Sequence, residues 1–290
     1  MLVTLALMST SSAIGVGDQV DRAPAPDQSG NYLFRWKDSG GSDREFLFVP
    51  GGKIAPQIGV TVSRQDGVSF LYRYLIANGR TAVEKLANCY VDVAMPARII
   101  NTPAGWESGQ PSEIAPRAGW FMLRFTDGVP NGAPPGSEVD GFEIASVNLP
   151  GATEFTCWGD GLPHRLPDDL PTSIVEQLDT VPGSREVVVR SIGPVIPRPD
   201  DPIPTLLRRV IRNYRQPLAA SAHQSRKSLV AALDQLGDAL TAGDRNRLLS
   251  TLTGLADQLG QNTEDPWGRQ LAKGLYECIT YVFTRLEQTR

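Results

Sequence analysis

Ser191-Ile-Gly-Pro-Val-Ile-Pro-Arg-Pro-Asp-Asp-Pro-Ile-Pro204 separates two parts of the chain that have different hydrophobic patterns. Before it, short apolar runs alternate with polar residues and are broken by Gly and Pro, which is typical of strands and turns. After it, leucines recur every three or four residues, which is typical of amphipathic helices. Proline at five of its positions predicts a stiff, extended spacer that holds a β domain and a helical domain apart or at a set angle.

Length and charge agree with this division. With 290 residues, of which 41% are hydrophobic, the chain is long enough for two ordinary domains. The net charge of -4 is too small to indicate a polyanionic or polycationic partner. Residues 1–204 contain 16 Lys and Arg against 24 Asp and Glu, and residues 205–290 contain 12 against 8. The two parts therefore carry charges of opposite sign.

The part before the spacer is predicted to form about eight strands with short connections, as in a two-sheet antiparallel sandwich. The strongest strand signal is the run 68–76, in which alternate residues Val68, Phe70, Tyr72, Tyr74 and Ile76 share one face. The other predicted strands are 32–36, 45–49, 58–63, 82–93 with a bulge near Leu86, 119–126, 141–147 and 185–191.

Two finer expectations concern the middle of this part. In the run 119–126, Phe121, Leu123 and Phe125 are predicted to point inward, and Trp120 outward. The cluster Leu149-Pro-Gly151 is predicted to be a turn.

The part after the spacer is predicted to form a small up-down bundle of four helices. The first helix, which carries Leu207 and Tyr214, should end near Pro217. Gly243 is placed to end the second helix, Asp244 to cap the third and Gly260 to end it. The fourth should begin at Asp265-Pro266, an N-cap followed by proline at the first helical position.

Four stretches of the part before the spacer belong together in this comparison, namely Tyr72–Asn78, Gly105-Trp106, Gly141–Gly151 and Ser191–Pro194. Together they resemble an immunoglobulin-like (Ig-like) domain of uncharacterised secreted bacterial proteins. The resemblance covers roughly residues 58–194, and residues 228–244 are similar to the generic helical modules appended to some secreted bacterial enzymes and surface proteins. It implies an Ig-like antiparallel β-sandwich followed by a small helical bundle, and it implies no catalytic residue. The expected domains are a signal remnant and tether in 1–30, the sandwich in 31–193, the linker in 194–204 and the bundle in 205–290.

Residues 1–14 resemble the apolar core and small-residue end of an export signal, with a cleavage site at Ser11–Ala13, although no positive residue precedes the core. Whether residues 1–13 are cleaved or belong to the mature chain stays open. No later stretch has the ~20 consecutive apolar residues of a transmembrane helix. We therefore expect a protein of the periplasm, the cell envelope or the medium.

Three cysteines are too few for a disulfide scaffold. Cys89 and Cys157 both fall in strand-like stretches on the parity that should face inward. Two interpretations stay open for them, a disulfide that closes a long loop and a pair of buried thiols. Cys278 is interpreted as a buried packing residue of the last helix.

The sequence contains no signature of catalysis, cofactor binding or metal binding. Its two histidines, His164 and His223, lie in different predicted domains, which argues against a His-based triad or zinc site. The carboxylate pairs Asp168-Asp169 and Asp200-Asp201 lie beside prolines, where solvated turn or capping roles are expected. No cofactor and no metal are predicted.

Aromatic residues and a group of arginines give the indications of a ligand. Trp106, Trp120 and Trp158 would bind a sugar if an exposed pair of them formed a stacking platform, and core packing is the alternative. In the first helix, Arg208, Arg209, Arg212 and Arg215 form a basic face, which suits an anionic surface or simply solvent.

From these observations we expect an exported, non-enzymatic binding or adhesion-type protein. Its partner would be another protein, a glycan or an envelope component, and the acidic chain argues against nucleic acid. Two alternatives stay open. One is an accessory module of a hydrolytic system with an unrecognised carboxylate site, and the other is an assembly protein that oligomerises through its helices.

Overall fold

The computed structural model describes residues 21–24, 30–50, 52–65, 69–123, 131–160, 170–178, 180–181, 186–197, 200–220, 224–260 and 266–288. The chain forms two compact units. The smaller consists of Met1–Pro50 and Pro163–Ser184, and the larger of Gly51–Leu162 and Arg185–Arg290. Each unit is described by itself.

The smaller unit contains a three-stranded antiparallel sheet of β1 (Asp21–Pro24), β2 (Tyr32–Lys37) and β3 (Asp43–Phe48), and the helix α1 (Thr172–Leu178). Its core consists of apolar side chains from both segments of the unit, namely Phe34, Trp36, Phe48, Ile174, Leu178 and Val181. The predicted strands near residues 32 and 45 therefore exist, but they do not belong to the sandwich. The sequence interpretation missed this because local alternation does not say which sheet a strand joins.

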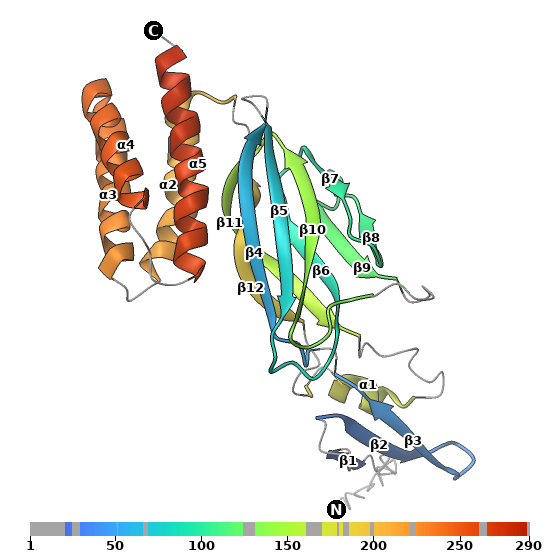
Figure 1. Cartoon of the computed structure of the whole chain (residues 1–290). Helices are drawn as coiled ribbons and strands as arrows, with labels where there is room; N and C mark the ends of the chain where they lie inside the picture. Colours follow the sequence, from blue (N-terminus) through green and yellow to red (C-terminus); the bar gives the residue numbers. More distant parts are fainter. Residues whose placement is uncertain are drawn as a thin grey trace, which may run out of the picture. The chain divides into compact units, whose positions relative to one another are not determined.

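The larger unit contains two antiparallel sheets (Figure 1). The first has the order β4 (Pro56–Gln65), β5 (Ser69–Asn78), β10 (Ser137–Ser146), β7 (Ala97–Asn101). The second has the order β12 (Val187–Ile196), β11 (Leu149–Gly159), β6 (Leu86–Asp92), β9 (Arg117–Met122), β8 (Trp106–Gly109). The expected class, antiparallel β-sheets joined to a helical part, is confirmed.

Aromatic side chains pack between the two sheets. Phe70, Tyr72, Tyr74 and Ile76 of β5 are completely buried, as the alternation predicted, and Val68 lies outside the described residues. The ring of Tyr74 lies 5.0 Å from that of Phe155 on the opposite sheet. Phe142 of β10 lies 5.3 Å from Trp120 of β9. These contacts place the core between the sheets, with one face of each sheet turned inward.

Two strand predictions are wrong in detail. Trp120 points into the core and Phe121 away from it, the reverse of the expected parity. The cluster Leu149-Pro-Gly151 is not a turn but the beginning of β11. A proline is tolerated there because the ladder register between β11 and β12 shifts at this point. The bulge expected near Leu86 is confirmed by the register shift between β11 and β6.

The four helices after the spacer are α2 (Ile203–Ala219), α3 (Gln224–Ala242), α4 (Arg245–Gly260) and α5 (Pro266–Gln288). Gly243 follows α3 with a φ of 68°, and the backbone N–H of Arg247 donates to Asp244 Oδ1 at 3.0 Å, so both predicted helix signals are confirmed. The helix α2 ends at Ala219, so the predicted end near Pro217 is confirmed, and Pro217 itself lies inside the last turn. Its position in the last turn means that only a terminal part of the helix loses a donor. Asp265 lies outside the described residues.

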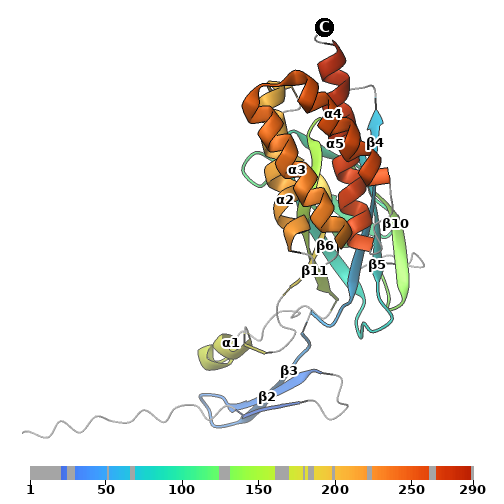
Figure 2. The same ribbon diagram turned by 90° about the vertical axis from the view of Figure 1, so that its left-hand side faces the viewer.

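The helices pack directly on the sheets, with α2 and α5 against β11 and β12, and α5 also against β4 (Figures 1 and 2). Tyr214 Oη donates to Pro150 O at 3.0 Å, and Gln270 Nε2 donates to Ile58 O at 2.7 Å. The expectation that the spacer holds the two domains apart is therefore wrong, and the alternative of a set angle between them stays a prediction. Within the predicted linker 194–204, Pro194–Ile196 belong to β12 and residues from Ile203 onward to α2. In the described part of the chain, no helix has the length and apolar character that crossing a membrane requires.

Candidate functional site

Two of the three tryptophans proposed for a sugar platform lie in the core. Trp106 is 5% exposed and Trp120 is completely buried, and both rings contact Phe142 between the sheets. They cannot stack on an external ligand, so this part of the prediction is wrong. The physical reason is strand parity, which turned both rings toward the other sheet.

The side chain of Trp158 lies on the opposite face of the five-stranded sheet. On β11 it alternates with the buried residues Cys157 and Gly159, so it lies on the outer face of the five-stranded sheet, the face turned away from the other sheet. There it meets Tyr90 of β6, with ring centroids 5.4 Å apart, and Tyr90 meets Phe121 of β9 at 5.2 Å. All three rings are half-buried. We call Tyr90, Phe121 and Trp158 the aromatic cluster.

Strand register aligns the cluster with polar groups. Trp158 lies opposite Asn88, Asn88 opposite Phe121, and Phe121 opposite Glu107. One row across four strands therefore reads aromatic, amide, aromatic, carboxylate. The half-buried side chain of Asn88 forms no hydrogen bond within the described residues, and Glu107 is exposed. Since neighbouring strands lie about 4.8 Å apart, Trp158 and Phe121 are separated by roughly 10 Å across the sheet.

The next row contains two glycines. Gly119 lies opposite Tyr90, and Gly109 lies opposite Gly119. A Cβ atom on Gly119 would lie 2.9 Å from Tyr90 Cδ1 and 3.1 Å from Phe121 Cζ. The absence of a side chain therefore allows both rings to lie close to the backbone of β9. This partial burial raises the pKa of the Tyr90 hydroxyl.

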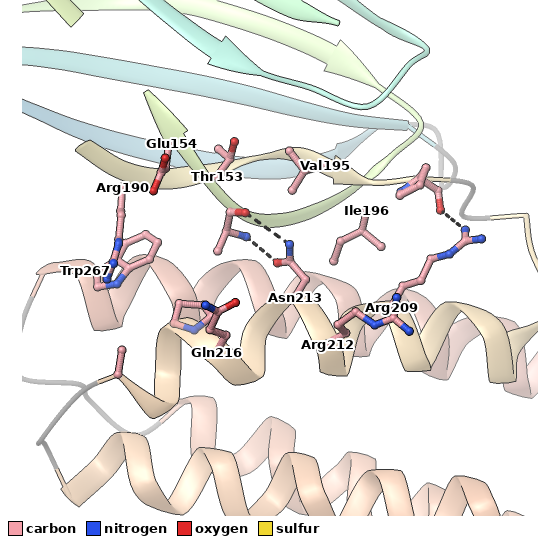
Figure 3. A pocket seen from close by; sticks show the side chains of 14 residues that line it. Thr153, Glu154, Arg190, Val195, Ile196, Arg209, Arg212, Asn213, Gln216 and Trp267 are labelled. Carbon is pink, nitrogen blue, oxygen red and sulfur yellow. Dashed lines mark hydrogen bonds between the residues drawn. The ribbon is translucent and has the colours of Figure 1, made fainter. Parts of the chain in front are cut away.

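The second feature of this face is a groove of about 640 Å³ between the sheet and α2 (Figure 3). One wall carries Thr153 and Glu154 of β11 with Arg190 and Val195 of β12. The other carries Arg209, Arg212, Asn213 and Gln216 of α2 and Trp267 of α5.

The wall formed by α2 is fixed by polar contacts. The backbone N–H of Ala152 donates to Asn213 Oδ1 at 2.7 Å, beyond the part of β11 that pairs with β6. The Arg209 guanidinium pairs with the Asp201 carboxylate and donates to Pro197 O at 3.0 Å. Arg190 and Arg212 are exposed and form no ion pair within the described residues. The groove therefore has a rigid frame and two free cationic side chains.

Cys89 and Cys157 lie directly opposite each other on β6 and β11, with their Sγ atoms 3.4 Å apart. Both are free thiols, and burial raises the pKa of the Cys89 thiol. The structure therefore holds the buried-thiol form, and a disulfide between them stays a prediction for an oxidising compartment. Cys278 is buried in α5, as expected, and its thiol donates to Pro150 O at 3.1 Å.

The remaining predicted groups take no part in a common site. Asp201 is bound to Arg209, and Arg215 of α2 pairs with Asp234 of α3 at 2.8 Å. His164, His223, Asp168 and Asp169 lie outside the described residues, as do residues 1–20 with the expected export signal. Among the side chains that are described, no group of three or more His, Cys, Asp or Glu is placed to hold a metal ion.

Sequence reasoning missed Tyr90, Phe121 and Asn88. A signal for Tyr90 existed, because Cys89 and Val91 were expected to face inward and the residue between them must then face outward. Phe121 was missed because its strand was given the wrong parity. No local signal for Asn88 exists, since its place between two rings depends on the pairing of three strands. Neither a scan against protein-family models nor a search of the curated proteins found a match to this chain.

Proposed function

We propose that this chain is a non-enzymatic binding protein and that its ligand is a glycan held on the outer face of the five-stranded sheet. The observation that carries the proposal is the row Trp158, Asn88, Phe121 with Tyr90 beside it. It puts half-buried aromatic rings on both sides of an amide that has no hydrogen-bond partner among the described residues.

This arrangement suits the chemistry of a sugar. A sugar ring has an apolar C–H face that packs on an aromatic ring, and hydroxyl groups at its edge that both donate and accept hydrogen bonds. The Asn88 amide offers two donors and one acceptor oxygen, and the Glu107 carboxylate is an acceptor at the end of the row. The edge-to-face contacts fix the rings against one another, which lowers the entropy lost on binding.

The strand order supports the further proposal that the sandwich is Ig-like. When β4, β5, β6, β7, β10, β11 and β12 are taken as strands A to G, one sheet reads A-B-E-D and the other begins G-F-C. Ig constant-type domains have these two sheets. The β8–β9 hairpin then follows D and extends the second sheet beyond C, and Phe121 and Glu107 lie on this extension.

Export is part of the same proposal and rests on residues 1–14. A protein of the envelope or the medium would meet the glycans of cell surfaces. Binding of a protein partner on this face is the competing outcome, since half-exposed aromatic residues are also frequent in protein interfaces.

The test is a glycan panel followed by calorimetric titration of the full chain. We expect Trp158→Ala and Phe121→Ala each to weaken binding of the selected glycan about tenfold or more, as removal of an aromatic anchor does. Asn88→Ala should weaken it as well, because the amide loses its hydrogen bonds with the ligand.

The matched control is Tyr276→Ala. This tyrosine is 44% exposed on α5 and lies outside the cluster, so its removal should leave the affinity unchanged. The proposal fails if no glycan on the panel binds, or if the cluster variants bind as tightly as the unaltered chain while their thermal unfolding is normal.

A further inference from the structure

The groove contains more free donors than acceptors. Of the three arginines that line it, only Arg209 has an acidic partner within the described residues. Arg212 lies toward the end where Arg209 is found, and Arg190 toward the end where Trp267 is found (Figure 3). Among the described residues that line the groove, the only acidic one is Glu154, which lies opposite Arg190 in the β11–β12 ladder. The lining therefore carries a net positive charge.

Trp267 contributes its ring to the lining of the groove. Its Nε1 atom is buried and has no hydrogen-bond partner among the described residues, so the ring offers apolar surface to a ligand and not a donor. The two guanidinium groups of Arg190 and Arg212 therefore select for a ligand that is rich in acceptor oxygens.

The groove and the aromatic cluster belong to one surface. The outward residues of β11 are, in order, Ala152, Glu154, Thr156 and Trp158. The first two line the groove and the last belongs to the cluster. Four residues of an extended strand cover about 13 Å, so Glu154 and Trp158 lie within reach of a single oligosaccharide. Thr156 between them faces Tyr90 on one side and Val188 on the other.

We infer that the groove holds a carboxylate of the ligand and that the glycan is therefore acidic, with uronic acid residues. This inference rests on the proposed glycan-binding function. A guanidinium binds a carboxylate through two parallel N–H bonds, which neutral hydroxyls cannot match. Arg212 at one end of the groove and Arg190 at the other each supply one such guanidinium for a carboxylate of the glycan, and the cluster stacks on a neighbouring sugar.

The experiment compares acidic polysaccharides with their carboxyl-reduced forms, in which each uronic acid is converted to the neutral sugar of the same linkage. With the full chain, we expect reduction of the carboxyl groups to weaken binding about tenfold or more. Binding of the acidic form should also weaken as salt is added, and binding of the reduced form should not.

A double variant and a control variant test whether the preference for the acidic form comes from the groove. Arg190→Gln with Arg212→Gln should lower the affinity for the acidic form to that for the reduced form. The control is Arg208→Gln, an exposed arginine of the same helix that does not line the groove, and it should change neither affinity.

The outcomes separate the two proposals. If acidic and reduced forms bind equally, or if Arg208→Gln has the same effect as the double variant, the carboxylate site is overturned and the glycan-binding function stands. If no polysaccharide binds in either form, the proposed function itself fails.

Discussion

The inner and outer faces of the five-stranded sheet use the same kinds of residue for opposite purposes. Trp120 and Phe121 are neighbours on β9, yet one is completely buried between the sheets and the other is half-exposed beside Tyr90. The inner face fills a core, where each ring contributes by burial and dense packing. The outer face leaves part of each ring free, next to glycines and to the Asn88 amide, which has no hydrogen-bond partner in the described part of the chain. An aromatic residue therefore indicates a ligand site only once its face of the sheet is known.

The largest effect expected from this comparison is on stability. Trp120→Ala should lower the free energy of unfolding by about 3–5 kcal/mol, because it leaves a cavity in a packed core. Phe121→Ala should lower it by only about 1 kcal/mol, because the ring is half-exposed. Urea unfolding followed by circular dichroism measures both. An equal loss of unfolding free energy in the two variants would show that the two rings are equally buried, which would contradict the difference between the faces.

A second, smaller effect concerns the end of the outer face that the helices cover. A Cβ atom on Gly274 of α5 would lie 2.5 Å from Tyr214 Oη, so Gly274→Ala should destabilise the protein by about 1–3 kcal/mol. Tyr214→Phe removes the oxygen that the new methyl group meets. The double variant should therefore lose less than the sum of the single losses, measured by the same unfolding titration.

Gly254→Ala is the matched control for Gly274→Ala in this double-mutant cycle. Gly254 also lies within a helix, and nothing is found within 4 Å of a Cβ placed on it. This variant should be more stable by about 0.5–1 kcal/mol, because alanine loses less backbone freedom than glycine. Strict additivity of Gly274→Ala and Tyr214→Phe would contradict the direct contact between α5 and α2.

The smallest effect is a change of stability at alkaline pH, and it concerns the inner face. Burial raises the pKa of the Tyr74 hydroxyl far above its ordinary value of 10.0, and this hydroxyl has no hydrogen-bond partner among the described residues. The unfolded chain therefore ionises Tyr74 above pH 10 while the folded chain keeps the proton, so stability falls as pH rises. Tyr74→Phe removes this loss.

We expect Tyr74→Phe to stabilise the chain at pH 7, because it removes a buried hydroxyl that has no hydrogen-bond partner among the described residues. The gain at pH 11 should exceed the gain at pH 7 by about 1 kcal/mol, since each pH unit above the unfolded pKa is equivalent to about 1.4 kcal/mol. Thermal unfolding at the two pH values measures this. The same gain at both values would mean that the hydroxyl is unfavourable for a reason other than its ionisation.

Sequence reasoning predicted the elements better than their assembly. The inward face of β5, the bulge near Leu86 and the helix signals at Gly243, Asp244 and Pro266 were all found, because each depends on residues close together in the chain. The strands near residues 32 and 45 were also found, but they were assigned to the sandwich when they belong to the smaller unit. That assignment depends on partners from residues 163–184, more than a hundred positions away.

For the site, Trp158 was chosen together with two tryptophans that lie in the core, and Tyr90, Phe121 and Asn88 were missed. The groove was missed entirely, because its arginines come from β12 and α2 and meet only when the helices pack on the sheet. The expectation that the spacer holds the two domains apart failed for the same reason. Prolines predicted extended backbone in residues 194–204, but they could not show that β12 continues to Ile196 and that α2 lies directly against the sheet.

The sequence by itself therefore determined most of the strands before residue 196 and the four helices after residue 203, although not α1, and it determined which side chains share a face of a strand or helix. It did so because hydrophobic periodicity and the residues at helix ends are local properties. Only the tertiary structure decided which face looks inward, which strands share a sheet and which rings stay accessible. Those choices depend on burying apolar surface contributed by segments distant in the chain, and no local pattern encodes them.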